Sequence, residues 1–304
     1  MDDRLAVLTR ENREIRKEVA SLRRWAAREG GGLQGMLQRR GLKIHRTAPR
    51  ERMLVHSDDA AIVQDRVYEL LHRYSCRLLL RDAIRVREGF RSEDLTTYCS
   101  TRAARAYCTT LRGIGLIVEN PDGTLGLRQR SVTSFGETLE WFVAEILRRE
   151  FYAEVVHGVS LRTPPPGGDF DVIAAMEGLL VYMETKSSPP RGIEAEEMAG
   201  FLERYRILAP HMALFLVDTH LRMWDKMVPI LEELVGGVPR DSALELRKVQ
   251  RLEREIFHWR HRIYVLNSSR GILSNLRCCF LDFLRRGNTG TAMEWEGTRG
   301  IRKA

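Results

Sequence analysis

The stretch GDFDVIAAMEGLLVYMETK, residues 168–186, decides the fold of this chain. It holds two short apolar runs, VIAA and LLVYM, which are separated by the pair Glu177-Gly178. Runs of this length that are joined by a tight turn containing glycine are typical of a β-hairpin. Because both runs are apolar throughout, we expect both strands to be buried.

The charged residues of this stretch stand at the ends of the apolar runs. Asp171 opens the first run and Glu184 closes the second. Glu184 and Lys186 are two residues apart, so their side chains point to the same side of a strand. The hairpin therefore gathers two carboxylates and an ammonium group, a set that can bind a divalent cation and activate water.

The neighbouring segments complete an α/β pattern. Upstream, the segment GETLEWFVAEILRR, residues 136–149, has apolar residues at the spacing of an amphipathic helix. Downstream, we expect a second helix over Ile193–Leu208 and another buried strand over His211–Val217. This order of helices and strands predicts an α/β core with a mixed sheet.

At these residues the segment 134–218 resembles the PD-(D/E)xK nuclease superfamily, also called restriction-endonuclease-like. The resemblance implies a nuclease core and assigns three site residues. Asp171 matches the metal-binding acid, Glu184 the second acid and Lys186 the lysine of the motif.

The resemblance also implies a glutamate on the preceding helix. Glu140 fits this position best, because it shares a helix face with Val143 and Leu147, and Glu137 is the second candidate. One departure from the motif is that Phe170 stands where a proline often does, a position that varies in the superfamily.

The resemblance implies metal-dependent chemistry at a phosphate. The implied oxygen ligands for Mg²⁺ or Mn²⁺ are Asp171, Glu184, Glu140 and the carbonyl of Thr185. A bound ion would polarise the phosphoryl group and lower the pKa of a water, and Lys186 would orient that water or stabilise the developing charge. In the alternative interpretation, Glu184 and Lys186 form a solvated pair at a strand end and Asp171 caps a turn.

Length and composition favour a cytoplasmic protein. The 304 residues are enough for about two domains. We find no apolar run long enough to span a membrane, and the charged start MDDRLAVLTREN does not resemble a secretory signal. The five cysteines show no CxxC spacing, which favours reduced thiols over a zinc site.

Positive charge is concentrated in the N-terminal part. Residues 1–130 contain 26 lysines and arginines against 17 aspartates and glutamates, whereas the whole chain has a net charge of +8. Arginine dominates this excess, and its guanidinium group suits bidentate contacts with phosphate. We therefore expect this part to bind a polyanion.

The first 29 residues predict a short coiled coil. Apolar residues alternate at the first and fourth heptad positions, with Asn12 at one first position, which favours a parallel pair in fixed register. The heptad residues are Leu5, Leu8, Asn12, Ile15, Val19, Leu22 and Ala26. We expect a homodimer through this helix, although a helix that packs on its own body is the alternative. Residues 30–55, which begin with glycines, are expected to form a linker.

Residues 56–130 resemble a winged helix-turn-helix domain. We expect a helix after Ser57, a short helix over Glu93–Cys99, a third helix up to Gly113, and a β-hairpin wing around Asn120–Gly123. The third helix would enter the major groove of double-stranded DNA. The predicted DNA-binding residues are Arg102, Arg105, Thr109 and Arg112 on that helix, and Arg128 and Arg130 after the wing. Contacts with another protein are the alternative use of this domain.

Residues 131–304 are expected to form the nuclease-like domain with a helical C-terminal extension. In the extension we predict helices over Leu221–Leu234, Asp241–Trp259 and Ser269–Arg286, and a strand over Arg262–Leu266. His258 and His261 are interpreted as structural.

Two functions from different classes fit these patterns. The first is a metal-dependent DNA endonuclease that the winged helix directs to its substrate. The second is a noncatalytic DNA-binding regulator or assembly factor with a nuclease-like core. We favour the enzyme because the set of Asp171, Glu184 and Lys186 is intact. RNA is a weaker substrate candidate, since no aromatic stacking platform is evident.

Overall fold

The computed structural model describes residues 14, 17–18, 32–56, 58–162, 168–236 and 248–287. Its centre is a mixed sheet of eight strands, in which β6–β7 and β7–β10 pair parallel and the other neighbours antiparallel. In their order across the sheet the strands are β1 (Lys43–Thr47), β4 (Glu154–Arg162), β5 (Asp169–Met176), β6 (Leu179–Lys186), β7 (Met212–Val217), β10 (Ile263–Asn267), β9 (Ile256–Trp259) and β8 (Gln250–Glu253). The predicted α/β fold with a mixed sheet is confirmed.

The hairpin of the opening stretch consists of β5 and β6. Its turn residues Glu177 and Gly178 have φ angles of 49° and 77°, as both central residues of a type I′ turn require. Glycine adopts this conformation at little cost, which explains why the turn forms at the predicted position. The apolar residues of both strands are buried because helices cover both faces of the sheet.

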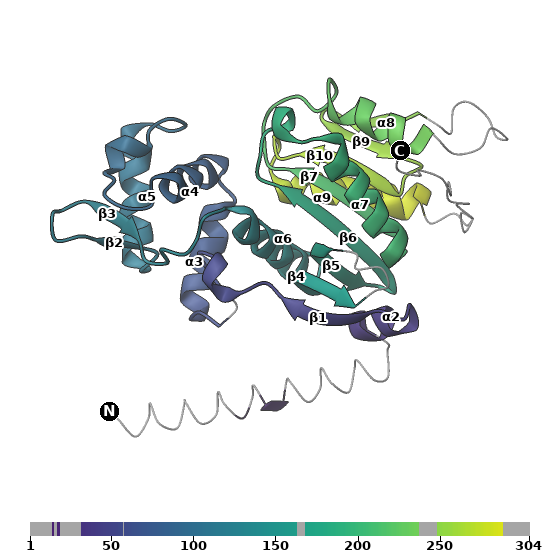
Figure 1. Ribbon diagram of the computed structural model, residues 1–304, viewed down its shortest axis with the longest axis horizontal. Helices are drawn as coiled ribbons and strands as arrows, with labels where there is room; N and C mark the ends of the chain where they lie inside the picture. Colours follow the sequence, from purple (N-terminus) through teal and green to yellow (C-terminus); the bar gives the residue numbers. More distant parts are fainter. Residues whose placement is uncertain are drawn as a thin grey trace, which may run out of the picture.

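The helices form layers on the two faces of the sheet (Figure 1). One face packs against α6 (Gly136–Glu150) and α9 (Ile272–Asp282), which continues into the single π turn η5 (Phe283–Gly287). The other face packs against α2 (Leu33–Arg39), α7 (Ala195–Leu208) and α8 (Met227–Gly236), with the short turn η3 (Pro190–Gly192) before α7. The order from α6 through β4, β5, β6 and α7 to β7 positions the candidate site.

A group of helices lies to one side of the sheet (Figure 1). Its elements are η1 (Arg50–Arg52), α3 (Ala61–Leu71), α4 (Tyr74–Val86), η2 (Ser92–Leu95), α5 (Thr101–Gly113) and the hairpin of β2 (Ile117–Glu119) and β3 (Leu125–Leu127). Its apolar core is continuous with the core under α6. The winged-helix assignment of this region stays a prediction.

Two features of this region differ from the expectation, and one agrees with it. The helix α4 was not predicted, and the short helix expected over Glu93–Cys99 is a single 3₁₀ turn, η2. The helix that ends at Gly113 begins at Thr101, where the Ser100 hydroxyl accepts a hydrogen bond from the Ala103 amide. The coiled coil predicted for residues 1–29 lies outside the described residues, except for positions 14, 17 and 18.

Residues 33–47 are not the linker that we expected there. They form α2 and β1, and β1 pairs with β4 at the edge of the sheet. The Ala48 amide then donates to the Gly158 carbonyl at 2.6 Å, which extends this pairing past the end of β1. Glycines at the start of this segment suggested flexibility, whereas its apolar residues Leu33, Met36 and Leu37 are buried under the sheet.

The helix expected over Asp241–Trp259 is wrong for the residues that the structure describes. Residues 250–259 form the hairpin of β8 and β9, with Arg254 at a φ angle of 40° in its turn. The apolar spacing resembled a helix face, but Ile256 to Trp259 are all buried as a strand between β8 and β10.

Among the described helices, none combines the length and the apolar character that crossing a membrane requires.

Candidate active site

The central strands end along one edge of the sheet, the edge that runs across the strand direction. The parallel register aligns Lys186 of β6, Val217 of β7 and Asn267 of β10. The antiparallel register pairs Val172 of β5 with Met183 of β6, so β5 begins at the same edge. Ligands of α/β sheets bind at the carboxyl ends of parallel strands, and the predicted site residues lie at this edge.

A cavity of about 170 Å³ opens at the start of β5. Its acidic lining residues are Glu137, Glu140, Asp169 and Asp171. Two of the four have arginine partners in the lining, since Arg46 lies 3.9 Å from Asp169 and Arg52 lies 3.8 Å from Glu137. No ion pair or hydrogen bond neutralises the half-buried Glu140 carboxylate within the described part of the chain.

Two acids of this cavity, Glu140 and Asp171, hold their protons strongly. Burial, together with the charges of Asp171 and Glu137, raises the pKa of Glu140 to about 9. Burial and the charge of Glu184 raise the pKa of Asp171 to about 7. Carboxylates that disfavour one another's charge in this way are stabilised by a bound cation, so the cavity is suited to a metal ion.

The space beside Glu140 depends on a glycine of β4. Gly158 has a φ angle of 55°, which favours glycine. A Cβ atom at this position would lie 2.6 Å from the Ala48 Cβ and 3.2 Å from the Glu140 Oε2. The absent side chain therefore lets the β1 end and the Glu140 carboxylate approach the same point of β4.

Thr185 connects Asp171 to the second predicted acid. The Thr185 amide donates to Asp171 Oδ2 at 2.7 Å, and its hydroxyl lies 3.3 Å from the same oxygen. These two contacts hold the Asp171 carboxylate of β5 against Thr185, the residue of β6 that lies between Glu184 and Lys186. The predicted contribution of Thr185, its carbonyl oxygen, is a separate group from these two donors.

Glu184 is buried and does not line the cavity. Its Oε1 accepts from Arg204 at 2.8 Å and lies 3.2 Å from the Lys186 Nζ. The Tyr182 hydroxyl donates to Oε2 at 2.5 Å and in turn accepts from the Arg204 Nε at 2.7 Å. The structure thus brings Asp171 and Glu140 together in the cavity and gives Glu184 a network of its own.

Lys186 carries a firm positive charge. Burial acts to lower its pKa, but Glu184 and Glu197 outweigh burial, and the pKa of Lys186 is raised. Glu197 of α7 lies 2.9 Å from the Lys186 Nζ. A lysine that stays protonated can stabilise negative charge on a phosphate, whereas it is unsuited to accept a proton.

Several residues of this site were not predicted from the sequence. Asp169 carried a signal, because it lies two residues before Asp171 on the same strand. Tyr182 was counted only as part of an apolar run, although its hydroxyl binds Glu184. Arg204 and Glu197 sit on α7, and no local pattern links that helix to the end of β6.

The six predicted DNA-binding residues are all exposed, and the four on α5 share its outer face. They are Arg102, Arg105, Thr109, Arg112, Arg128 and Arg130. Four of them lie near carboxylates of the same region. The pairs are Arg105–Glu93 (2.7 Å), Arg112–Glu119, Arg128–Asp59 (4.0 Å) and Arg130–Glu88 (3.2 Å). Exposed pairs of this kind are weak and can exchange for phosphate.

A second group of titratable residues lies at the β9–β10 turn, where β10 begins. The rings of His258 and His261 stack at 3.9 Å, and His261 Nδ1 lies 2.7 Å from Asp282. Tyr264 donates to the same Asp282 oxygen at 2.8 Å. Burial and the neighbouring His261 lower the pKa of His258 to about 4. The structural interpretation of both histidines stays a prediction.

No protein-family model and no curated protein matches the chain. Among solved structures, it is similar to protein VC1899 from Vibrio cholerae, with 16% identity and a TM-score of 0.43 over 66% of this chain and 55% of that one. It is also similar to Can2 from Sulfobacillus thermosulfidooxidans, solved in complex with cyclic tetra-adenylate, with 11% identity and a TM-score of 0.44 over 84% of this chain and 61% of that one. The chain spans between half and two thirds of the length of these two proteins. Likeness at this level carries no argument about function.

Proposed function

We propose that this protein is a metal-dependent DNA endonuclease that hydrolyses phosphodiester bonds. The observation that carries the proposal is the cavity at the start of β5, where Glu140 and Asp171 share a small space and both have raised pKa values. Such a pair serves no evident purpose for stability, whereas it suits a divalent cation. Lys186 lies at the same sheet edge with a firm positive charge.

The proposed ligands for Mg²⁺ or Mn²⁺ are Asp171, Glu140, Glu184 and the Thr185 carbonyl. When bound, the ion would supply charge neutralisation and a water of lowered pKa. The Thr185 amide orients the Asp171 carboxylate through its 2.7 Å hydrogen bond. Lys186 would stabilise the negative charge that develops on the phosphate, or orient the attacking water. Glu184 would hold Lys186 in place through their 3.2 Å contact.

The remaining parts of the chain would bring DNA to this edge. The exposed face of α5 would contact duplex DNA, with Arg102, Arg105, Thr109 and Arg112, while Arg128 and Arg130 would touch phosphates. A homodimer through residues 1–29 would suit cutting of both strands, because each active site could take one strand.

One observation favours the second candidate, a noncatalytic DNA-binding regulator. The Glu184 carboxylate is already bound by Arg204, Tyr182 and Lys186. If this network never opens, the cavity keeps only Asp171 and Glu140 as inner ligands, and the nuclease-like core would act through its shape.

The deciding experiment incubates the full chain with supercoiled plasmid and linear duplex in Mg²⁺, Mn²⁺ or EDTA. The wild type is compared with Asp171→Ala, Lys186→Ala and Asp225→Ala, the last an exposed acid on the loop before α8. We expect metal-dependent cleavage by the wild type and Asp225→Ala, and none by the two site variants, which should still bind DNA. Absence of cleavage in every metal, with DNA binding retained, would favour the noncatalytic regulator. Equal cleavage by all four proteins would refute the assigned site.

A further inference from the structure

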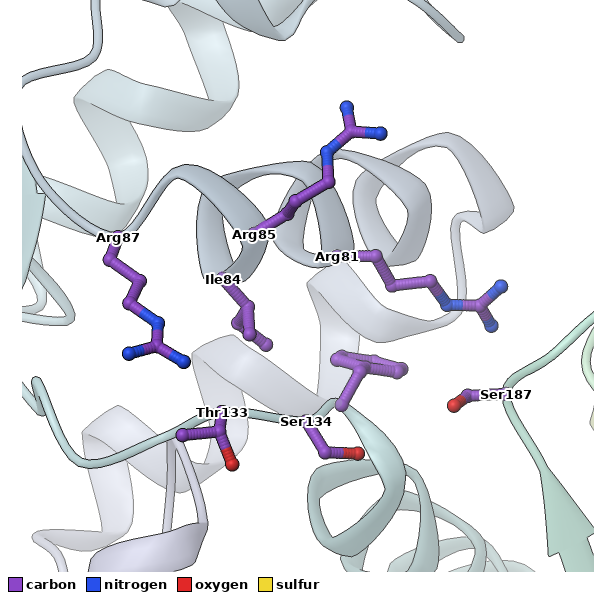
Figure 2. A pocket seen from close by; sticks show the side chains of 8 residues that line it. Arg81, Ile84, Arg85, Arg87, Thr133, Ser134 and Ser187 are labelled. Atoms are coloured by element: carbon purple, nitrogen blue, oxygen red, sulfur yellow. The ribbon is translucent and has the colours of Figure 1, made fainter.

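A second and larger cavity lies at the same edge of the sheet. Its volume is about 440 Å³, within the range of about 300–1,000 Å³ that is typical of small-ligand sites. Its lining includes Arg81 of α4, Arg87 directly after α4, Ser134 just before α6 and Ser187 directly after β6 (Figure 2). Ser187 follows Lys186 and Ser134 precedes Glu137 by three residues, so this cavity adjoins the candidate active site.

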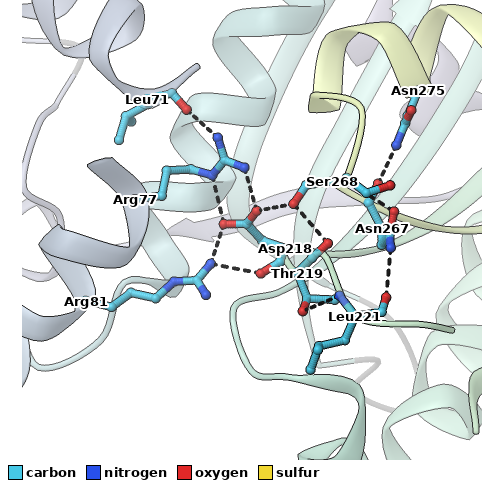
Figure 3. A network of polar contacts seen from close by, with 10 residues as sticks. Leu71, Arg77, Arg81, Asp218, Thr219, Leu221, Asn267, Ser268 and Asn275 are labelled. Atoms are coloured by element: carbon cyan, nitrogen blue, oxygen red, sulfur yellow. Dashed lines mark hydrogen bonds and ion pairs between the residues drawn. The ribbon is translucent and has the colours of Figure 1, made fainter. Parts of the chain in front are cut away.

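Arg81 brings positive charge that its partners do not cancel (Figure 3). The buried Asp218 carboxylate binds Arg77 through contacts of 2.9 and 2.7 Å and also binds Arg81, so that one negative charge serves two guanidinium groups. Ser268 donates to the same carboxylate at 2.7 Å. The Arg81 Nε–H is buried and has no hydrogen-bond acceptor within the described residues. An anion in the cavity would supply the missing charge.

Arg87 is held in place by an unusual backbone conformation. Its φ and ψ angles are 68° and −57°, and the Glu88 amide donates to the Val86 carbonyl at 2.9 Å, which together form a strained γ-turn. The Arg87 amide donates to Ala83 at 2.7 Å, and its carbonyl accepts from Leu127 at 3.2 Å. The backbone is therefore fixed at both groups, while the exposed guanidinium has no carboxylate partner in the described part of the chain.

The side-chain directions match a site for an anion. In Figure 2, Arg81 extends toward Ser187 and Arg87 extends toward Thr133, from two ends of the same cavity. The N-terminus of α6, a helix of 15 residues, begins at Gly136, whose amide donates to the Ser134 hydroxyl at 3.0 Å, and the helix dipole adds partial positive charge at this end. Arg85 also lines the cavity, but its guanidinium points away in Figure 2 and pairs with Asp82 at 2.8 Å.

We infer that this cavity binds a backbone phosphate of the DNA strand next to the phosphate that is cleaved, with Arg81 and Arg87 as its ligands. This inference rests on the proposed nuclease function. The site joins the helical region to the catalytic edge, since the Asp218 amide also donates to the Lys186 carbonyl at 2.8 Å. A phosphate held by Arg81 would thereby be placed relative to Lys186 through a short chain of direct contacts.

The test measures binding of the full chain to a fluorescent DNA duplex by anisotropy in EDTA, where no cleavage occurs. Arg87→Gln is compared with Arg85→Gln, the matched control two residues earlier, in the last turn of α4. Arg87→Gln should bind about tenfold more weakly, as expected for loss of one charge-assisted contact, and its salt dependence should fall by about one phosphate. Arg85→Gln should bind as the wild type does, and Arg87→Gln should unfold at the wild-type temperature.

A second arm separates DNA from a small phosphorylated ligand, because either could provide the phosphate. Inorganic phosphate and ATP are titrated against the wild type and Arg87→Gln by calorimetry. Weakened DNA binding by Arg87→Gln, with only weak binding of both small anions, supports the inference. DNA binding that is unchanged in Arg87→Gln overturns it, also when that variant loses ATP or phosphate. These binding measurements need no catalysis. Absence of cleavage in the plasmid assay would therefore refute the nuclease function without deciding whether the cavity binds phosphate.

Discussion

Glu140 is the residue whose chemistry says most about the site. Its pKa and that of Asp171 are raised in the folded protein, so the native state keeps protons that the unfolded chain releases above about pH 4. The two carboxylates therefore favour folding least at high pH, and stability attributable to them is lost as the pH rises through about 7 and 9. A cation bound between them would reverse this loss.

Replacement of Glu140 by Gln should stabilise the metal-free protein at pH 8. Glutamine removes the charge and keeps the shape, so the melting temperature should rise by about 2–4 °C for each kcal/mol gained. Mg²⁺ should raise the melting temperature of the wild type and not that of Glu140→Gln. Glu137→Gln is the control, because Arg52 partly offsets the charge of Glu137 at 3.8 Å. A larger response in Glu137→Gln would make Glu137 the helix carboxylate of the site.

The affinity for Mg²⁺ should increase with pH. Asp171 and Glu140 must release their protons before they can bind a cation, and their pKa values are about 7 and about 9. Titration calorimetry at pH 6, 7, 8 and 9 should show tighter binding at each step, with protons released on binding. In Asp171→Asn the dependence near pH 7 should disappear. An affinity that is constant from pH 6 to 9 would contradict a site made of these two acids.

At the scale of single elements, β4 is shaped by Gly158. Alanine there would be strained at a φ angle of 55° and would clash with Ala48 and Glu140. Gly158→Ala should cost about 1–3 kcal/mol in denaturant unfolding and should also weaken Mg²⁺ binding, because the Glu140 carboxylate must move. Gly113→Ala is the matched control, since Gly113 lies at the end of α5 with open space around it. Equal stability of the two variants would show that β4 relaxes around the new side chain.

The β5–β6 hairpin could be predicted because its information is local. The apolar runs, the Glu177-Gly178 turn and the charges at the strand ends all lie within one short stretch. The partners of Glu184 could not be predicted in the same way. Arg204 approaches from α7 only when that helix packs on β6, and a hydroxyl such as that of Tyr182 looks apolar in a buried run. The residue spacing within a single helix or strand gives little information about its contacts with other elements.

At the scale of the whole molecule, the sheet edges were the least predictable feature. The strand β1 is separated from its partner β4 by more than 100 residues, and nothing in its short, polar sequence announces this pairing. The residues of β8 and β9 were predicted to be helical for the same reason, because the burial of β9 depends on its pairing with β10. The cavity could not be predicted for the same reason, since Gly158 shapes it only through contacts with the end of β1 and with Glu140 of α6.

The helical region and the sheet are joined by Asp218, and this joint should be essential for stability. Burial raises the pKa of Asp218, but Arg77 and Arg81 outweigh burial, so its pKa is lowered and the carboxylate stays charged. Asp218→Asn would leave Arg77 buried at 1% exposure without a counter-charge. Breaking a buried pair in this way costs about 3–5 kcal/mol.

Denaturant unfolding of Asp218→Asn should show this loss, and the helical region should separate from the sheet as an earlier transition. Asp225→Asn is the control, because Asp225 pairs with Arg222 at 3.6 Å on the surface and should change stability by less than about 1 kcal/mol. Asp218→Asn should also weaken DNA binding, because Arg81 loses the anchor that aims it at the cavity. A variant with wild-type stability would refute the joint, and one that is destabilised but binds DNA normally would remove Arg81 from the phosphate site.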